Sequence, residues 1–290
     1  MLPTVWWDNK SGVVMKRLML LVLLVLVTVF STQGCIGPCE VRWACSKVRG
    51  SGDVVTEERP VSDITGVELA TIGNLYIELG DTEKLLIEAE DNLLEYFETE
   101  VHRGILTIKT RRNTNLSPRE PVNYYLTVKE LNRIEISSAG DVEAPDLKAK
   151  RFKISNSSAG DLTMGALECT ALEVNLSSAG DVDIEELNAR TLKVDISSAG
   201  TLEIGGGEVD EQFVHLSSAG DYNAEDLLSA EADVSLSSVG SARIQVSDYL
   251  DADLSSMGSL YYRGNPRVHQ RTSSMGKVKR IGKSHRSRSI

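Results

Sequence analysis

Aromatic side chains are scarce in this sequence and make up 5% of its 290 residues, whereas glycine occurs 23 times. This composition argues against a bundle of helices and favours many short strands joined by turns. Positive charge is also in deficit, because the net charge is −11. An acidic chain is a poor partner for nucleic acid, so we expect no such partner for its main body.

Histidine is rare, and His102, His215, His269 and His285 are scattered along the chain. The sequence contains no arrangement typical of a Ser-His-Asp nucleophile, no glycine-rich phosphate loop and no paired metal ligands. We therefore expect a non-enzymatic protein without a metal or cofactor. The less favoured alternative is a polysaccharide-active enzyme, but such enzymes build a cleft from long loops, for which this sequence leaves little room.

A long apolar run occurs near the N-terminus, from Leu18 to Phe30, directly after Met15-Lys16-Arg17. It is shorter than the roughly 20 apolar residues of a transmembrane helix. A basic start followed by a short apolar run is typical of a secretory signal peptide. We interpret residues 1–34 as this signal, with residues 1–14 as an upstream extension and Met15 as the true start.

The segment Ser31-Thr32-Gln33-Gly34-Cys35 resembles a bacterial lipobox, although Thr32 stands where leucine is usual. We expect lipidation of Cys35, which anchors the exported chain to a membrane of the cell envelope without spanning it. The alternatives are a cleaved, soluble secreted protein and an uncleaved anchor. Residues 35–50 are then a linker.

The other cysteines are Cys39, Cys45 and Cys169. We predict a disulfide between Cys39 and Cys45, because disulfides persist outside the cytoplasm. A metal site at Cys35, Cys39 and Cys45 is disfavoured, since the spacing matches no zinc pattern and no histidine lies near. Cys169 stands among apolar repeat positions and is expected in the core.

The most conspicuous feature is a repeat of Ser-Ser-Ala-Gly-Asp, which begins at Ser137 and recurs with a period of 20 and then of 18 residues. There are eight copies, four of them exact and four that vary at the alanine or aspartate position, and a degenerate ninth lies at Thr71–Leu75. We expect the glycine of each copy to supply the backbone conformation that a corner needs. The predicted corner glycines are Gly140, Gly160, Gly180, Gly200, Gly220, Gly240, Gly258 and Gly276.

Strictly alternating segments flank each copy, as in Leu172-Glu-Val174-Asn-Leu176, and indicate half-buried strands. A unit of 18–20 residues cannot bury its own apolar face, but stacked units can. The sequence therefore predicts an all-β fold with a parallel β-solenoid over residues 131–281. Residues 51–130 form a less regular β region that caps the first coil. A β-sandwich is less favoured, because it requires no constant spacing.

The common register predicts an acidic column of Asp141, Asp161, Asp181 and Asp221. Equal charges about 5 Å apart repel, so backbone N–H groups, serine hydroxyls or a bound cation must offset them. We favour a turn-stabilising role over calcium binding, because Thr201 interrupts the column and the repeat of calcium-binding β-rolls is absent.

Three segments, Gly52–Arg59, Ile64–Leu69 and Glu88–Leu93, together with the Gly-Asp repeats, resemble a family of bacterial proteins. It is the "putative auto-transporter adhesin, head GIN domain" family. The resemblance extends from about Ser51 to Ile281. It implies a right-handed β-helix at the cell surface, often behind a lipoprotein signal, and it implies no established activity.

Two non-enzymatic functions are compatible with these features. An adhesin would bind surface glycans or proteins with a solenoid face, to which Tyr222, Tyr249, Tyr261 and Tyr262 could contribute, although the last two could equally form a capping patch. A structural scaffold of the envelope would self-associate end to end. The basic tail, residues 282–290, either contacts anionic lipid or polysaccharide or only keeps the chain soluble.

Overall fold

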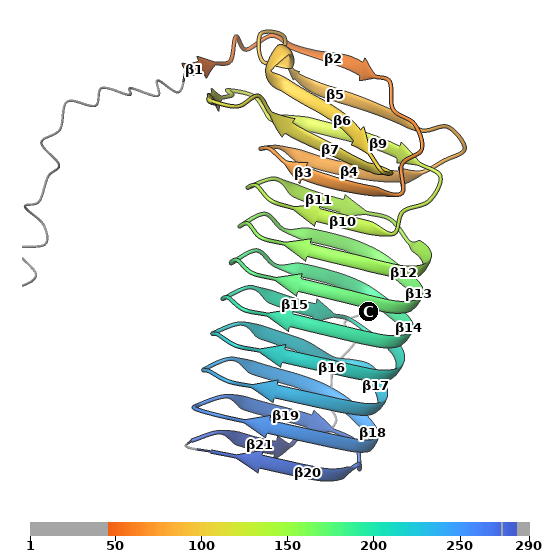
Figure 1. The fold of residues 1–290 in the computed structure, drawn as a ribbon, viewed down its shortest axis with the longest axis vertical. Helices are drawn as coiled ribbons and strands as arrows, with labels where there is room; N and C mark the ends of the chain where they lie inside the picture. Colours follow the sequence, from red (N-terminus) through yellow and green to blue (C-terminus); the bar gives the residue numbers. More distant parts are fainter. Residues whose placement is uncertain (1–45, 274, 283–290) are drawn as a thin grey trace, which may run out of the picture. The chain divides into compact units, whose positions relative to one another are not determined.

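The computed structural model describes residues 46–273 and 275–282, which belong to one compact unit. The predicted signal peptide, Cys35, Cys39, Cys45 and tail residues 283–290 lie outside the described residues. Apart from one short 3-10 turn, η1 (Leu94–Tyr96), the regular elements are strands (Figure 1). They are β1 (Ser46–Arg49), β2 (Val54–Arg59), β3 (Gly66–Ala70), β4 (Asn74–Leu79), β5 (Lys84–Glu90), β6 (Phe97–His102), β7 (Ile105–Thr110), β8 (Thr114–Ser117), β9 (Asn123–Val128), β10 (Arg133–Ile136), β11 (Asp141–Ala144), β12 (Leu147–Asn156), β13 (Leu162–Leu176), β14 (Val182–Ile196), β15 (Thr201–Ile204), β16 (Gly207–Leu216), β17 (Asp221–Leu236), β18 (Ser241–Leu254), β19 (Ser259–Arg263), β20 (Arg267–Thr272) and β21 (Lys277–Arg280).

Strands β10 to β21 wind into a stack of parallel coils (Figure 1). In β13 and β14 each residue faces the one 20 positions later, as Leu172 faces Leu192. Side chains alternate between core and solvent, so the in-register apolar positions form buried columns. The prediction of an all-β solenoid is confirmed. One such column contains Ile134, Ile154, Val174, Val194, Val214 and Val234.

The degenerate ninth copy of the repeat forms a corner of the first coil. Strands β3 and β4 pair in parallel with β10 and β11, and Asn74 faces Asp141. Gly73 therefore occupies the position that Gly140 occupies in the next coil. Between these two coils the chain makes a long excursion, β5 to β9, before it returns to the stack.

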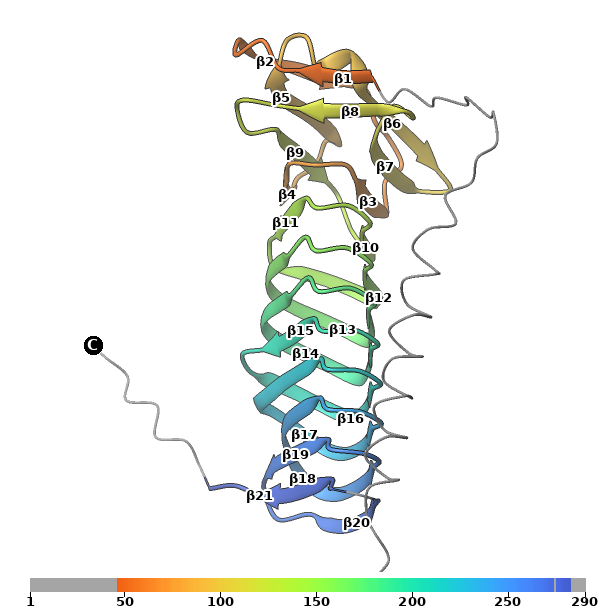
Figure 2. The same ribbon diagram turned by 90° about the vertical axis from the view of Figure 1, so that its left-hand side faces the viewer.

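This excursion closes the N-terminal end of the stack (Figure 2). Strands β7 and β9 continue the parallel ladder on β3 and β4. Strands β5 and β6 then pair antiparallel to β9 and β7, and β2 pairs antiparallel to β5. The core of this cap contains Phe97 and Tyr124, whose rings meet edge to face with centroids 5.7 Å apart.

A polar clamp at the end of β5, formed by Glu90, Asp91 and Asn92, holds the segment through which the chain enters the cap. The buried Glu90 carboxylate accepts the N–H of Gly52 at 2.6 Å. Asn92 accepts the N–H of Ser51 at 2.9 Å and donates to the carbonyl of Arg49. These residues lie in or next to Glu88–Leu93, one of the segments that carry the family resemblance. This part of the shared sequence pattern therefore has a structural cause.

The change of period from 20 to 18 residues occurs at a corner that lies within the paired strands β17 and β18. The register shifts between Ala224 and Leu228 and again between Ser229 and Glu231. Arg263 reaches this corner with a side chain that is only 8% exposed, and it forms ion pairs with Glu225 at 3.0 Å and with Asp226 at 2.8 Å. The sequence predicted the shorter coils but not the buried arginine.

Candidate functional site

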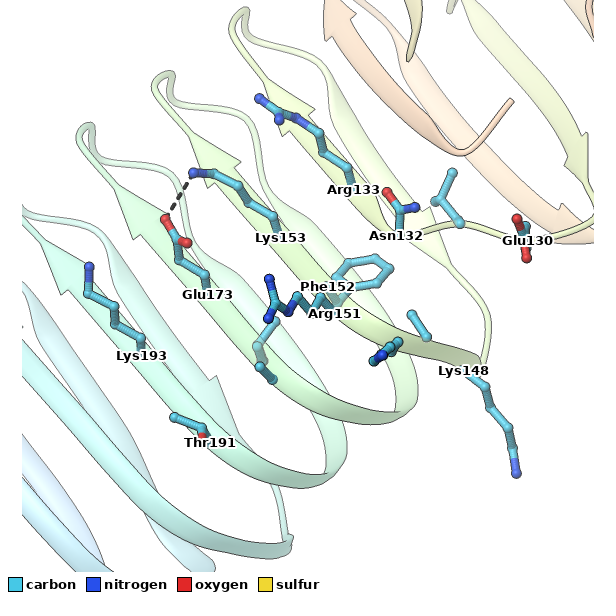
Figure 3. Close-up of a pocket in the computed structure, with 15 residues that line it drawn as sticks. Glu130, Asn132, Arg133, Lys148, Arg151, Phe152, Lys153, Glu173, Thr191 and Lys193 are labelled. Carbon is cyan, nitrogen blue, oxygen red and sulfur yellow. Dashed lines mark hydrogen bonds and ion pairs between the residues drawn. The ribbon is translucent and has the colours of Figure 1, made fainter. Parts of the chain in front are cut away.

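A concave pocket of about 850 Å³ lies where the cap meets the stack, along the start of β12 (Figure 3). Its lining contains six cations but only two carboxylates, in a chain whose net charge is −11. We call it the basic groove. Its charged lining residues are Arg133, Lys148, Lys150, Arg151, Lys153, Lys193, Glu130 and Glu173.

The groove exists because residues 129–132 and the start of β12 lead into neighbouring, paired strands from different directions. Strand β10 begins only at Arg133, which faces Lys153 of β12. The preceding segment, residues 129–132, comes down from the cap and diverges from β12. Leu147–Phe152 therefore pairs with β13 alone, and Phe152, which is 2% exposed, lies in the floor of the groove.

Arg133, Lys153 and Lys193 lie in one column across successive coils, with Glu173 between the two lysines (Figure 3). Glu173 accepts from Lys153 at 2.9 Å and from Asn175 at 2.9 Å. The bond from Asn175, and then that from Lys153, holds the pKa of Glu173 below its usual range. Part of the positive charge in this column is thus neutralised within the protein.

Among the described residues, two of the six groove cations, Lys150 and Arg151, are not compensated by a carboxylate, whereas others are. Lys193 pairs with Asp195 at 3.2 Å, and Lys148 pairs with Glu168 at 2.6 Å. Within residues 46–273 and 275–282, neither Lys150 nor Arg151 has an ion-pair partner, and both are exposed. They are the groove charges most available to an anionic ligand.

The sequence contained a signal for this site that composition alone does not reveal. Lys148-Ala-Lys150-Arg151-Phe-Lys153 places four cations within six residues, at the start of a coil in an acidic chain. The next coil has Glu168 and Glu173 opposite Lys148 and Lys153. The repeat identifies the residues that the coils share, whereas the groove depends on residues in which one coil differs from the others.

The predicted acidic column lies on the opposite strand of each coil, directly after the corner. Asp141 accepts the N–H of Asp161 at 3.0 Å, and Asp161 accepts that of Asp181 at 2.9 Å. Asp181 in turn accepts the N–H of Thr201 at 2.8 Å. Asp221 lies two coils from Asp181, and the N–H of the next coil there binds a glycine carbonyl instead. Three of the four carboxylates thus contact backbone donors of their neighbours.

Asp183 lies next to this column and was not predicted from the sequence. Burial, followed by the charges of Asp181 and Asp161, raises its pKa. No group of three or more His, Cys, Asp or Glu side chains in the described ranges has the geometry to hold a metal ion.

The corner glycines differ from our expectation in their physical role. Only Gly52, Gly73, Gly104, Gly207 and Gly264 have positive φ among the described glycines, so Gly140 and its seven equivalents do not adopt the expected conformation. Glycine is required there because the coils approach closely. A Cβ at Gly160 would lie 2.0 Å from the carbonyl oxygen of Gly140, and one at Gly180 would lie 2.2 Å from that of Gly160.

The remaining candidates are dispersed. Cys169 is a free, half-buried cysteine, and burial raises its pKa to about 11, so it is a poor nucleophile. Tyr222 is in the core, whereas Tyr249 and Tyr261 lie under the guanidinium groups of Arg267 and Arg243. In the part of the chain that the structure describes, no helix is long and apolar enough to cross a membrane.

The fold defines the class of this protein: a parallel β-solenoid closed at its N-terminal end by an antiparallel cap. The chain belongs to the family described as "Putative auto-transporter adhesin, head GIN domain", which matches residues 63–266. The resemblance inferred from the repeats is confirmed, and the family is one of adhesin-like proteins of the cell surface.

Solved structures share this fold. A putative adhesin from Parabacteroides merdae is 21% identical with a TM-score of 0.73, and the match covers 81% of this chain and 99% of that one. A "putative lipid binding protein" from Parabacteroides distasonis is 21% identical with a TM-score of 0.65, covering 82% and 100%. A putative adhesin from Bacteroides fragilis is 19% identical with a TM-score of 0.62, covering 81% and 100%. No curated protein matches the chain.

Proposed function

We propose that this chain is an exported, non-enzymatic binding module, tethered to the cell envelope through lipidated Cys35, which contacts its ligand at the basic groove. The observation that carries the proposal is the groove itself, a concentration of six cations in an acidic protein. A basic concave surface attracts anionic partners over a long range and orients them. The adhesin descriptions of the family and of two of the solved structures support a binding role.

The lining of the groove favours binding over catalysis. It contains no histidine, cysteine, serine or tyrosine, and its two carboxylates are Glu130 and Glu173, the second of which is occupied by Lys153. The groove is bounded by strands and by the short segment 129–132, rather than by long loops. This arrangement offers charge and shape, but little of the acid-base machinery that a glycan-active enzyme needs.

The charge of the last coil argues against a scaffold in which two copies join by their C-terminal ends. Its outermost strands are β20 and β21, which carry the cations Arg267, Arg271, Lys277, Lys279 and Arg280. Cations on an edge strand oppose pairing with an identical edge, and natural sheets use them to prevent aggregation. Tail-to-tail self-association through this edge is therefore disfavoured.

Adhesion of cells that display the full chain tests the proposal. We expect the double variant Lys150→Glu/Arg151→Glu to lose most binding to anionic surfaces, such as alginate-coated or acidic-protein-coated plates. The matched control is Arg243→Glu/Lys279→Glu, which makes the same change in net charge on the other side of the coils. Equal loss in both variants, or in neither, would refute a specific role for the groove.

The tether is tested on the same cells by mass spectrometry of the mature N-terminus. We expect acyl chains on Cys35 and, in Cys35→Ala, release of the protein into the medium. An unacylated N-terminus in the wild type would contradict the lipoprotein assignment, while leaving the groove intact as a binding site.

A further inference from the structure

The upper edge of β12 is an unoccupied strand position. Other central coils have a paired strand on both sides, but Leu147–Phe152 pairs only with β13, and β10 joins β12 no earlier than Lys153. Within the described residues no backbone hydrogen bond crosses this edge before Lys153. The gap is bordered by the basic groove and, at its Leu147 end, by a second pocket of about 410 Å³, lined in part by Leu79, Leu131 and Leu147.

Backbone groups at this edge are directed into the gap. The N–H of Lys153 donates to the carbonyl of Asn132 at 3.0 Å, and the N–H of Ser157 donates to that of Ile136 at 2.9 Å. N–H and C=O groups alternate in direction along a strand, and side chains alternate regularly from Arg151 to Asn156. The N–H and C=O of Arg151 therefore point to the same side as those of Lys153, where a new strand could pair with them.

The side chains around the gap select the kind of strand. Lys148, Lys150 and Arg151 oppose basic strands, including the terminal strands β20 and β21 of another copy, and their desolvation opposes wholly apolar ones. An acidic strand removes both penalties. Leu79, which is 48% exposed, lines the pocket at the Leu147 end and offers contact to an apolar residue on the same strand.

We propose that the basic groove receives an extended acidic segment of a partner protein, which adds to β12 as an extra strand along Leu147–Phe152. Main-chain hydrogen bonds supply affinity and the lysine and arginine side chains supply selectivity, as in other strand-addition complexes. The bound stretch is about six residues, or roughly 20 Å. This inference rests on the groove being the contact region, and it specifies the partner and the mode of contact.

The test is peptide binding to the full chain in detergent, measured by fluorescence polarisation. The probe is a nine-residue peptide of alternating valine and glutamate, compared with its form N-methylated at alternate residues and with a valine-lysine peptide. N-methylation keeps the charge but removes strand hydrogen bonds. We expect the acidic peptide to bind, and at least about tenfold weaker binding of the N-methylated form, the factor that the loss of one or two backbone hydrogen bonds implies.

A backbone variant of the protein gives the reciprocal result. Arg151→Pro removes the N–H that points into the gap, whereas Arg151→Ala removes only the charge, and thermal unfolding verifies that both are folded. We expect Arg151→Pro to weaken the acidic peptide about tenfold beyond the effect of Arg151→Ala. If Arg151→Pro does not fold, the comparison of the two acidic peptides on the wild-type protein still tests whether the peptide binds by strand addition.

The outcomes separate this inference from the proposed function. Equal binding of both acidic peptides would overturn strand addition. Binding of alginate, lost in Lys150→Glu/Arg151→Glu, with no peptide binding, would also overturn it and identify an anionic glycan as the ligand while retaining the groove. Absence of any binding that depends on Lys150 and Arg151 would overturn both.

Discussion

The close approach of the coils at their corners makes a sharp prediction for Gly160→Ala. The new Cβ would lie 2.0 Å from the carbonyl oxygen of Gly140, 2.9 Å from its carbonyl carbon and 3.0 Å from the carbonyl oxygen of Ser138. All three atoms are backbone, so no side chain can rotate away. The coils must separate by roughly 1.5 Å at this corner to reach van der Waals contact.

The cost follows from what that separation disturbs. Overpacking costs about 1–3 kcal/mol, and the corner is bracketed by two inter-coil hydrogen bonds, Ser157 N–H to Ile136 at 2.9 Å and Val142 N–H to Asp161 at 2.8 Å. Weakening both adds up to about 2 kcal/mol. We expect Gly160→Ala to lower the free energy of unfolding by about 3 kcal/mol, which lowers Tm by roughly 6–12 °C.

The matched control is Gly206→Ala, because a Cβ there meets nothing closer than the carbonyl oxygen of Asp226 at 3.9 Å. This variant should be neutral or slightly stabilised, since alanine restricts the unfolded chain. Urea and thermal unfolding followed by circular dichroism provide the comparison. If the two variants unfold within about 0.5 kcal/mol of each other, close approach is not the reason for glycine at the corners.

Two further predictions concern buried and half-buried polar groups. The raised pKa of Asp183 means that its ionised form is disfavoured in the folded state. Its contribution to stability is therefore complete below its ordinary pKa of 3.8 and is lost as the pH rises through the raised value. Asp183→Asn should raise Tm at pH 7, with a gain that disappears below about pH 4, and a gain in Tm that does not depend on pH would contradict this explanation. In the core, the Tyr222 hydroxyl donates to Gln212 at 3.0 Å, and Gln212 donates to Ser229 at 2.7 Å. Tyr222→Phe leaves the buried Gln212 oxygen without a donor and should lower the free energy of unfolding in urea by about 1–3 kcal/mol. The control is Tyr261→Phe, which should cost almost nothing because the Tyr261 hydroxyl makes no hydrogen bond within the described ranges. Equal costs for the two variants would show that the network contributes no stability.

The fold could be predicted from the sequence because one periodicity determines most of it. A repeat that returns every 20 residues places equivalent side chains above one another. The face that each alternating strand buries therefore follows from the positions of Leu172, Val174 and Leu176. The same reasoning located the degenerate corner at Gly73.

Other features depend on contacts that periodicity does not describe. The expected role of Gly160 was wrong because a recurring glycine indicates that a side chain is excluded but not whether backbone angle or neighbouring backbone excludes it. The basic groove requires residues 129–132 to diverge from β12 after an excursion through the cap. That path is a long-range property, as is the pairing of Arg263 with Glu225, 38 residues away.

The in-register stacking has a consequence for how such a protein can change in length. Each coil contacts chiefly the coil before it and the coil after it, through ladders that repeat with the same spacing. Duplication or loss of one whole coil beyond β14 would therefore preserve the corner contacts and leave both the cap and the basic groove, whose lining ends at Lys193 of β14, unaltered. The stack is an adjustable spacer, whose extent can drift by genetic duplication while the basic groove at its N-terminal end is inherited unchanged.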